Sequence, residues 1–487
     1  MPRPPRTATV VGSGPNGLAA ALVLARAGLQ VTVLEAAPTT GGGLRSGVTV
    51  PGFSDGPVHD HCATTFPLLR SAPFFREFGG ALTTRGLEFA SAPLDAVHVL
   101  TGRRSATLHT SVSDTAAGLP GRDGRIWQAS FGPLAARADA VTDEFLRPMA
   151  HLPRHPLLFA GFGIQAGLPA SRSWRRFRTP EARALFAGIA AHAFTPLTRP
   201  GSAAAGMMLA VTGHTHGWPV AVGGAQSVTD ALVGELESLG GRVVTDTPVT
   251  DLSQADADIV LLDTSVETAA LILGRRLPAS VARTWRRFRR GPAVAKVDYV
   301  IEGGIPWTSV NARRAGTVHL GGTAEQVAAA EQDCWDGRLP ERPFTLVGQP
   351  WLADPSRSVV TDGRTLNPVW AYAHVPPGWD GTEQQTLELV TTQIDREAPG
   401  FRQRVLGCAA APPAVVAQNP NNIGGDIAGG ACDLRQLLVR PRLLHPYDTG
   451  VPGVYLCSSS TAPGGGVHFM CGMNAAQRAL RVAETLE

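Results

Sequence analysis

The stretch from Thr7 to Ser46 reads TATVVGSGPNGLAAALVLARAGLQVTVLEAAPTTGGGLRS, and it decides the fold. A short apolar run leads into Gly12, Gly14 and Gly17, and a helix-like segment follows them. A second apolar run then ends at Glu35. This order predicts a strand, a glycine turn, a helix and a second strand, with the glycines at the G-x-G-x-x-G spacing of a dinucleotide fingerprint.

Each part of this βαβ unit suits one part of a nucleotide. The three glycines permit a tight turn, close approach of the backbone to a pyrophosphate, and close packing of the helix on the strand. The helix N-terminus then faces the phosphates, and Glu35 is placed to accept a hydrogen bond from a ribose hydroxyl. Because the 487 residues include 55 glycines, the alternative is a glycine-rich turn in an ordinary α/β unit.

The residues after Glu35 indicate which nucleotide binds. They form the pattern GGGLRS, in which a glycine doublet lets the chain bend back and Arg45 brings a guanidinium to the pyrophosphate. Dehydrogenases that bind only NAD do not need this second clamp. The pattern resembles the FAD-binding signature of the family that contains amine oxidases, phytoene desaturases, carotenoid isomerases and the Rab GDP-dissociation inhibitors. The alternative for Arg45 is a solvated surface arginine.

The C-terminal end carries a second junction of strand, glycine turn and helix. Residues 452–476 read PGVYLCSSSTAPGGGVHFMCGMNAA. They predict a strand over Val454 to Cys457, a turn at Gly464 to Gly466 and a helix from near Val467. In the resembled family this junction brings a helix N-terminus to the pyrimidine end of the flavin. The helix dipole there stabilises the negative charge of the reduced ring.

The resemblance covers nearly the whole chain, and it is most similar to bacterial flavoproteins of the phytoene desaturase-like group. It extends to the Gly224 region and to the segment from Asn419 to Ile427. It implies non-covalently bound FAD, with a backbone contact to adenine at Val249. The residues expected to bind FAD are Gly12, Gly14, Pro15, Asn16, Gly17, Glu35, Ala36, Gly42, Gly43, Leu44, Arg45, His61, Cys62, Val249, Asp263, Ser458, Ser459, Gly466, Val467 and His468.

Chain length and element order predict an α/β fold with two interleaved domains, because 487 residues are too many for one simple core. The expected Rossmann-type FAD-binding domain comprises residues 1–70, 217–284 and 436–487. The expected substrate domain, a mixed β-sheet and a helical part, comprises residues 71–216 and 285–435. Its strands are expected near 293–301, 316–320, 344–349 and 368–374, its helices near 132–150 and 181–193. The apolar segment from His155 to Pro169 is expected to line a cavity.

Composition limits the partners. With 44% hydrophobic and 17% charged residues the chain is globular, and a net charge of +3 does not suggest a nucleic-acid binder. Two basic clusters, WRRFR from Trp174 and WRRFRR from Trp285, are expected to be solvated helix faces with a buried Trp and Phe. Contact with an anionic membrane or an acidic partner is the alternative. No segment predicts a transmembrane helix, and the first strand starts too early for a secretory signal. The expected location is cytoplasmic, with peripheral membrane contact left open.

The six cysteines form no C-x-x-C pair, and no Cys/His group has the spacing of zinc ligands, so no metal site is expected. Scattered cysteines fit buried thiols in a reducing compartment.

The candidates for chemistry are His468, Tyr372, Lys296 and His61. His468 is placed either to donate to the flavin or substrate, or to cap a helix. In the resembled family, amine oxidases use a lysine to hold a water near flavin N5, but the sequence around Lys296 differs, so a structural lysine is the alternative. Tyr372 shares one strand face with Trp370 and His374, which would sandwich a substrate or simply pack in the core.

The resemblance implies an FAD-dependent oxidoreductase that dehydrogenates a hydrophobic small molecule, such as an isoprenoid, a polyene or a secondary-metabolite intermediate, by hydride transfer to flavin N5. The alternatives are an amine oxidase, a redox-neutral flavin isomerase, and a non-enzymatic binding protein like the GDP-dissociation inhibitors. Because the chain lacks a second dinucleotide fingerprint, the expected electron acceptor is dioxygen or a quinone.

Overall fold

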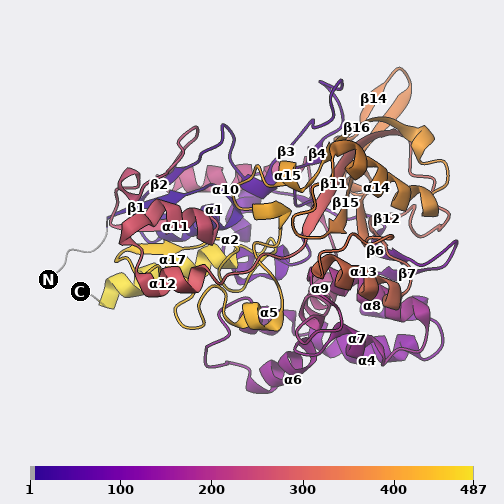
Figure 1. Ribbon diagram of the computed structural model, residues 1–487, viewed down its shortest axis with the longest axis horizontal. Helices are drawn as coiled ribbons and strands as arrows, with labels where there is room; N and C mark the ends of the chain where they lie inside the picture. The colour runs from indigo at the N-terminus through magenta and orange to yellow at the C-terminus, as the bar shows by residue number, and fades with distance from the viewer. Residues whose placement is uncertain (1–5, 486–487) are drawn as a thin grey trace.

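The computed structural model describes residues 6–485, in which two large β-sheets lie side by side with helices packed around them (Figure 1). The first sheet is wholly parallel, in the order β17-β10-β1-β2-β9. Its strands are β1 (Thr7–Val11), β2 (Gln30–Leu34), β9 (Arg242–Val244), β10 (Ile259–Leu262) and β17 (Val454–Leu456). Three parts of the chain that are distant in sequence therefore build one parallel sheet of the kind found in nucleotide-binding domains.

Both faces of this parallel sheet are covered, as its apolar strands require. Val10 and Leu261 point into a core shared with α1, α2, α10 and α17, whereas Val11 and Leu262 point into a core shared with α11 and α12. These helices are α1 (Pro15–Arg26), α2 (Pro73–Thr84), α10 (Gln226–Ser238), α11 (Val266–Leu273), α12 (Ala279–Trp285) and α17 (Met470–Thr485).

The second sheet follows the order β16-β11-β15-β13-β12-β6-β7, with β14 paired to β15. All its pairs are antiparallel except β6 with β12, so the predicted mixed sheet is confirmed. Its strands are β6 (Leu94–Val99), β7 (Ser105–Leu108), β11 (Ala293–Glu302), β12 (Ala315–Leu320), β13 (Thr345–Gly348), β14 (Val359–Thr361), β15 (Arg364–Val375) and β16 (Val405–Ala411).

The register of β11 and β15 shows which side chains share a face of this second sheet. The face that carries Lys296 and Tyr372 is called the inner face. Lys296 lies opposite Tyr372 and Asp298 lies opposite Trp370. Since side chains alternate along a strand, Tyr299 points to the other face. There its hydroxyl is hydrogen-bonded to Thr391 of α14 (Glu383–Glu397), 2.9 Å away.

A helical part covers one end of the second sheet (Figure 1). It contains α3 (Val112–Gly118), α4 (Asp123–Ala135), α5 (Ala138–Phe145), α6 (Pro156–Ala166), α7 (Ala170–Trp174), α8 (Pro180–Ala191), α9 (Ala203–His216) and α13 (Ala324–Trp335). The single helix predicted over 132–150 is wrong. The chain makes α4 and α5 instead, because the backbone at Arg137 leaves the helical region (φ −129°, ψ 28°).

Short elements link the two sheets: β3 (Ser46–Gly47), β4 (His59–Asp60), β5 (Phe89–Ala90), β8 (Val220–Ala221), α15 (Pro413–Val416) and α16 (Leu434–Leu438). The hairpin of β3 and β4 is anchored by Asp60. This buried carboxylate accepts hydrogen bonds from the Ser46 hydroxyl (2.6 Å) and the Ala225 N–H (2.8 Å), and it pairs with the fully buried Arg357. The anchor fixes the segment that follows Arg45.

Candidate functional site

The two glycine-rich junctions from opposite ends of the chain meet. Their strands, β1 and β17, both flank β10, and α1 packs along α17. The contact is so close that a Cβ on Gly472 of α17 would lie 1.9 Å from the carbonyl oxygen of Asn16 in the first turn of α1. Two helix N-terminal regions are therefore held side by side, as an extended dinucleotide requires.

The first junction has the geometry of a phosphate loop. Gly12 has a φ of +99°, and a Cβ on Gly17 would lie 2.1 Å from the Gly12 carbonyl oxygen, so side chains are excluded at both positions. Pro15 occupies the first turn of α1 and donates no hydrogen bond. The buried side-chain oxygen of Asn16 has no hydrogen-bond partner among residues 6–485. The backbone cradle formed by these glycines fits the pyrophosphate of a dinucleotide.

Glu35 stands at the end of β2 beside this loop. Its carboxylate accepts hydrogen bonds from the Ser13 N–H (2.8 Å), the Ser13 hydroxyl (2.6 Å) and the Ala37 N–H (2.9 Å). These donors orient an acidic group toward the place where the fingerprint puts a ribose. The loop that carries Val249 runs alongside, since the Thr247 N–H donates to the Glu35 carbonyl (2.8 Å). Val249 is half-buried on that loop.

Glu35→Ala is expected to weaken FAD binding by about ten- to a hundredfold, because a hydrogen bond to a charged group contributes about 1.5–3 kcal/mol. The dissociation constant of FAD, measured by titrating the deflavinated protein, checks this. Glu237→Ala, at an exposed position of α10, serves as the control. Equal dissociation constants for the wild type and Glu35→Ala would contradict the ribose assignment.

Asp263, predicted to bind the cofactor, is buried behind the same loop. Its Oδ2 accepts the Gly17 N–H at 2.8 Å, and a Cβ on Gly14 would lie 2.5 Å from that oxygen. Burial, with a smaller contribution from the charge of Glu35, raises the pKa of Asp263 to about 7. The proton is therefore held more tightly in the folded protein than in the unfolded chain. Below about pH 4 the resulting stabilisation is complete, and it is lost as the pH rises through about 7.

Asp263→Asn is expected to remove this pH dependence, because an amide carries no buried charge at any pH. Between about pH 5 and about pH 8, the free energy of unfolding of the wild type should fall by about 2–3 kcal/mol relative to that of the variant. Urea unfolding of both proteins at the two pH values measures it. Parallel pH dependences of the two proteins would show that the Asp263 carboxyl does not titrate in this range.

The loop that carries Arg45 folds back against the phosphate loop. The Gly41 N–H donates to the carbonyl oxygen of Ser13 (3.1 Å), and a Cβ on Gly42 would lie 3.1 Å from the Gly14 Cα. The Arg45 Nε donates to the Gly42 carbonyl at 2.9 Å, which holds its half-buried guanidinium over this turn. Leu44 is buried beneath it, and Ala36 lies at the other end of the loop. The geometry is that of a cation placed beside a phosphate site.

The segment with His61 and Cys62 leads from this loop toward the second sheet. The His61 N–H donates to the Arg45 carbonyl (2.8 Å), and the Cys62 Cβ lies 3.4 Å from the Cβ position of Gly43. Burial, and next the charge of Arg45, lower the pKa of His61. The charge of Lys296 also lowers the pKa of His61 and opposes the rise that burial causes in the pKa of Cys62, so both residues lie within electrostatic range of the second sheet.

Lys296 is buried on the inner face of the second sheet and forms an ion pair. Its Nζ donates to both oxygens of Asp298, at 2.5 and 2.6 Å, and the Thr49 hydroxyl donates to the same carboxylate at 3.0 Å. Lys296 is also the single lysine in the sequence, so every other side chain of the Lys/Arg type is an arginine. The site thus keeps one compact ammonium where the chain otherwise uses guanidinium groups.

Tyr372 lies in an aromatic group beside Lys296. Trp370 and Tyr372 meet at 5.0 Å with perpendicular rings, and the Tyr372 and His374 rings are stacked at 5.7 Å. The indole N–H of Trp370 has no partner within the described part of the chain. His374 is paired through Nδ1 with the buried Glu331 at 2.7 Å. This inner face is therefore aromatic, and its charged side chains are paired with one another.

Phe194 completes the aromatic group, and sequence reasoning missed it. Its ring stacks on His374 at 4.0 Å and on Tyr372 at 6.3 Å, and it packs with Val294 and Leu346. Its backbone has a φ of +50°, a conformation that non-glycine residues adopt mainly where the surroundings impose it, often at functional sites. The short sequence around Phe194 carries no pattern that signals this.

At the C-terminal junction the ring of His468 is engaged by the main chain. Nδ1 accepts the Met470 N–H at 3.0 Å, the ring is also hydrogen-bonded to the backbone of Gly464, and burial lowers the pKa of His468 to about 4. His468 is thus a neutral cap of α17. Together with the φ of +64° at Phe469, this cap explains why α17 begins at Met470 and not near Val467 as predicted.

The loop before this cap is held by Arg440, a residue that sequence reasoning missed. Its buried guanidinium donates to carbonyl oxygens of Ser459 (2.9 Å), Ala428 (2.7 Å), Gly430 (3.3 Å) and Ala431 (3.2 Å). Ser458 is buried in the same loop, and Gly466 and Val467 remain partly accessible at its tip. A buried cation therefore supports the second glycine turn.

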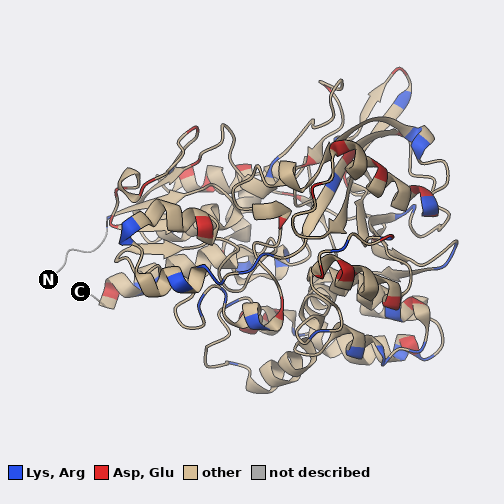
Figure 2. Ribbon diagram, in the orientation of Figure 1, with Lys and Arg blue, Asp and Glu red and all other residues tan. Residues whose placement is uncertain are grey.

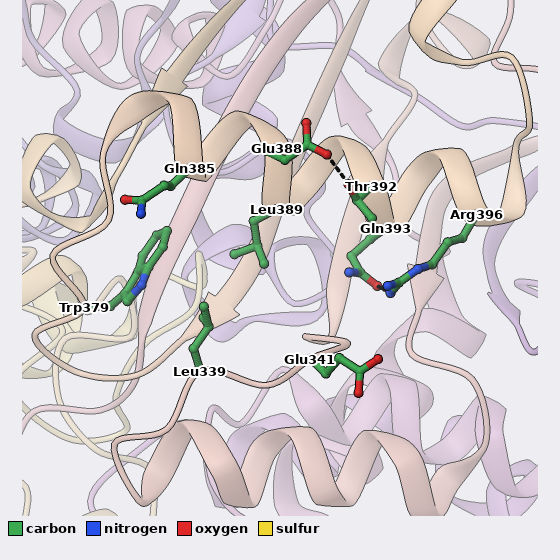
Figure 3. Close-up of a pocket in the computed structure, with 9 residues that line it drawn as sticks. All are labelled: Leu339, Glu341, Trp379, Gln385, Glu388, Leu389, Thr392, Gln393 and Arg396. Atoms are coloured by element: carbon green, nitrogen blue, oxygen red, sulfur yellow. Dashed lines mark hydrogen bonds between the residues drawn. The ribbon is translucent and has the colours of Figure 1, made fainter.

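Other features of the described residues lie apart from this site. A pocket of about 350 Å³ lies between α14 and the segments around Leu339 and Trp379 (Figure 3), on the sheet face opposite Lys296. Its Glu388 is already bonded to Thr392 and Arg402. Within residues 6–485, no cluster of His, Cys, Asp or Glu is arranged to hold a metal ion. No helix in that range has the length and apolarity to cross a bilayer.

The fold and the glycine-rich loop define a protein with a Rossmann-type dinucleotide-binding domain. A family model described as an NAD(P)-binding Rossmann-like domain matches residues 10–78. The chain is 24% identical to rat pyridine nucleotide-disulfide oxidoreductase domain-containing protein 2, over 98% of this chain and 94% of that protein. It is 36% identical to hydroxyneurosporene desaturase of Cereibacter sphaeroides over 34% of this chain and 32% of that enzyme.

Among solved structures, a putrescine oxidase redesigned in its cofactor binding has a TM-score of 0.62 and 17% identity, over 99% of both chains. These similarities support an oxidoreductase of the amine oxidase and desaturase type. The predicted α/β fold is confirmed, and these similarities support a dinucleotide cofactor of the FAD type.

Proposed function

We propose that this enzyme dehydrogenates a neutral, hydrophobic small molecule, such as an isoprenoid or polyene, and forms a carbon–carbon double bond. The observation that carries the proposal is the inner face of the second sheet. Phe194, Leu346, Trp370 and Tyr372 are buried there as one apolar cluster, while Lys296 is matched by Asp298. A substrate on this surface finds aromatic faces and no unmatched carboxylate that would bind an ammonium group.

When bound, FAD supplies a hydride acceptor at N5. The residues of this chain then have three tasks. The glycine turns and Arg45 would hold the cofactor, and the aromatic group would exclude water and orient the substrate. The ion pair of Lys296 and Asp298 would take up the proton that the substrate releases, through the carboxylate or a water molecule held at Nζ. The proposed electron acceptor is dioxygen or a quinone.

Oxidation of an amine is the second candidate. The perpendicular rings of Trp370 and Tyr372, 5.0 Å apart, favour it because aromatic faces attract cations. The fold shared with putrescine oxidase is compatible with it. Desaturation is preferred because the carboxylates of Asp298 and Glu331 are already paired with Lys296 and His374.

Anaerobic mixing of the FAD-loaded enzyme with candidate substrates separates these functions. Neutral polyenes or isoprenoids are expected to bleach the visible flavin absorbance and to yield a product with one more double bond. Bleaching by putrescine or cyclohexylamine alone would establish the amine oxidase. Isomerised product without bleaching would establish a redox-neutral reaction, and protein that cannot be loaded with FAD would overturn both proposals.

Lys296→Met is expected to slow flavin reduction by the substrate by at least about a hundredfold, since a positioned proton carrier contributes about 10²–10⁴ in rate. FAD binding should persist, because Lys296 is remote from the phosphate loop in sequence and belongs to the other sheet. Stopped-flow reduction rates and FAD content measure the two effects separately. The double variant Lys296→Met/Asp298→Asn controls for the carboxylate left unpaired. Loss of FAD with an unchanged reduction rate per bound flavin would assign Lys296 a purely structural role.

A further inference from the structure

Helix α6 presents an apolar stripe to solvent, contrary to the expectation that its segment lines a cavity. Leu157 is 90% exposed and Ile164 is 69% exposed, and Ala160 and Gly161 between them are exposed as well. These positions are spaced i, i+3, i+4 and i+7, so they form one side of the helix. The opposite side packs through Phe162 into the helical core.

The exposed side of α6 lacks the polar residues that solvent-facing helices normally carry. Its sequence, PLLFAGFGIQA, contains no charged residue. The helix lies at the lower edge of the molecule, and it is wholly tan in the charge-coloured view (Figure 2). Leu152, 91% exposed in the segment that leads into α6, extends the same apolar surface. Exposure of this apolar surface to water is unfavourable, so a partner is expected to cover it.

The chain around α6 carries positive charge only. Residues 145–180 contain no Asp or Glu, and their charged side chains of the Lys/Arg type are Arg147, Arg154, Arg172, Arg175, Arg176 and Arg178. Trp174 and Phe177 of this stretch are buried, as predicted, and the exposed members are arginines. The stretch therefore combines an apolar helix with one sign of charge.

A polar pocket of about 360 Å³ adjoins the segment between α5 and α6 and the side of α17. Arg147, Arg154 and Arg481 line it, and none of the three forms an ion pair within residues 6–485. Its one lining carboxylate, Asp143, is paired with Arg76. The pocket thus offers guanidinium groups that lack an anion.

We propose that the α6 surface, defined as Leu152, Leu157, Ile164 and the pocket of Arg147, Arg154 and Arg481, docks on an anionic lipid membrane. A helix that lies on a bilayer inserts apolar side chains into the interface, and neighbouring basic side chains contact the anionic headgroups. A second copy of this chain fits less well, since a symmetric contact would bring like charges together. Helix α6 has 11 residues, a length for lying in the interface and not for spanning it.

Sedimentation of the FAD-loaded protein with vesicles tests the proposal. Vesicles of phosphatidylcholine with added phosphatidylglycerol are expected to bind the protein, and vesicles of phosphatidylcholine alone to bind it at least about tenfold more weakly. Leu157→Ser/Ile164→Ser and Arg147→Gln/Arg154→Gln should each weaken binding to the anionic vesicles by about tenfold or more.

Two variants on other surfaces serve as matched controls. Leu271→Ser removes a leucine that is 77% exposed on α11, and Arg286→Gln/Arg287→Gln neutralises the second basic cluster. Both are expected to bind anionic vesicles like the wild type. The proposal is overturned by three results: no binding to anionic vesicles, binding lost only in the control variants, or a dimer in light scattering that Leu157→Ser/Ile164→Ser dissociates. Vesicle binding needs no turnover, so these outcomes are independent of the proposed reaction.

Discussion

Gly17→Ala protein is expected to purify colourless, with the affinity for FAD reduced by at least about a hundredfold. The added Cβ would lie 2.1 Å from the carbonyl oxygen of Gly12 and 3.0 Å from the Asp263 Cβ. Both neighbours belong to the backbone or stand next to it, so the clash moves the phosphate loop and not a flexible side chain. Misplaced loop amides lose several hydrogen bonds to charged phosphate oxygens, each worth about 1.5–3 kcal/mol. The visible spectrum of the purified protein and its FAD titration measure the effect.

Gly80→Ala is the matched control, because a Cβ on Gly80 in α2 would meet nothing within 4 Å. This variant should be yellow. Far-UV circular dichroism shows whether Gly17→Ala remains folded. A folded, yellow Gly17→Ala protein with wild-type FAD affinity would contradict the placement of the pyrophosphate at this turn.

Arg357→Met is expected to lower the free energy of unfolding by about 3–5 kcal/mol, the usual cost of leaving one partner of a buried ion pair alone. Arg357 and Asp60 have fully buried side chains, and Arg357 also donates to the Ala221 carbonyl at 3.0 Å. Binding of FAD should weaken as well, because Asp60 holds the hairpin that follows Arg45. Urea unfolding and FAD retention are the two measurements.

Two further variants make the Arg357 result interpretable. Asp60→Asn/Arg357→Met removes both charges and should recover part of the lost stability. Arg364→Met breaks the exposed pair with Glu302 and should change stability little. Equal effects of Arg357→Met and Arg364→Met would show that the buried pair does not anchor the hairpin.

The sequence could predict the parts of the site that are encoded by short-range spacing. Gly12, Gly17 and Glu35 lie within one βαβ unit, so their separation along the chain fixes their separation in space. The C-terminal glycine turn could be predicted from the sequence for the same reason. That the two turns meet follows from strand order, which the resemblance implied, and the packing of Gly472 on Asn16 agrees with it.

Other features depend on contacts between residues distant in sequence, which spacing does not encode. Asp60 and Arg357 are 297 positions apart, and Phe194 meets His374 across the molecule. The match of Lys296 with Asp298 is local, yet only the strand register shows that both point inward. The segment of α6 is apolar on all sides, so its periodicity does not tell which side is buried.

The most direct test of the account is a crystal structure of the enzyme loaded with FAD. We predict one extended molecule, with its ribose hydroxyl hydrogen-bonded to Glu35, its pyrophosphate at the turn of Gly12 to Gly17, and its ring between the turn of Gly464 to Gly466 and the surface of Lys296 and Tyr372. Electron density that placed the ring away from the C-terminal turn, or the adenosine away from Glu35, would contradict the claim that both glycine junctions serve a single cofactor.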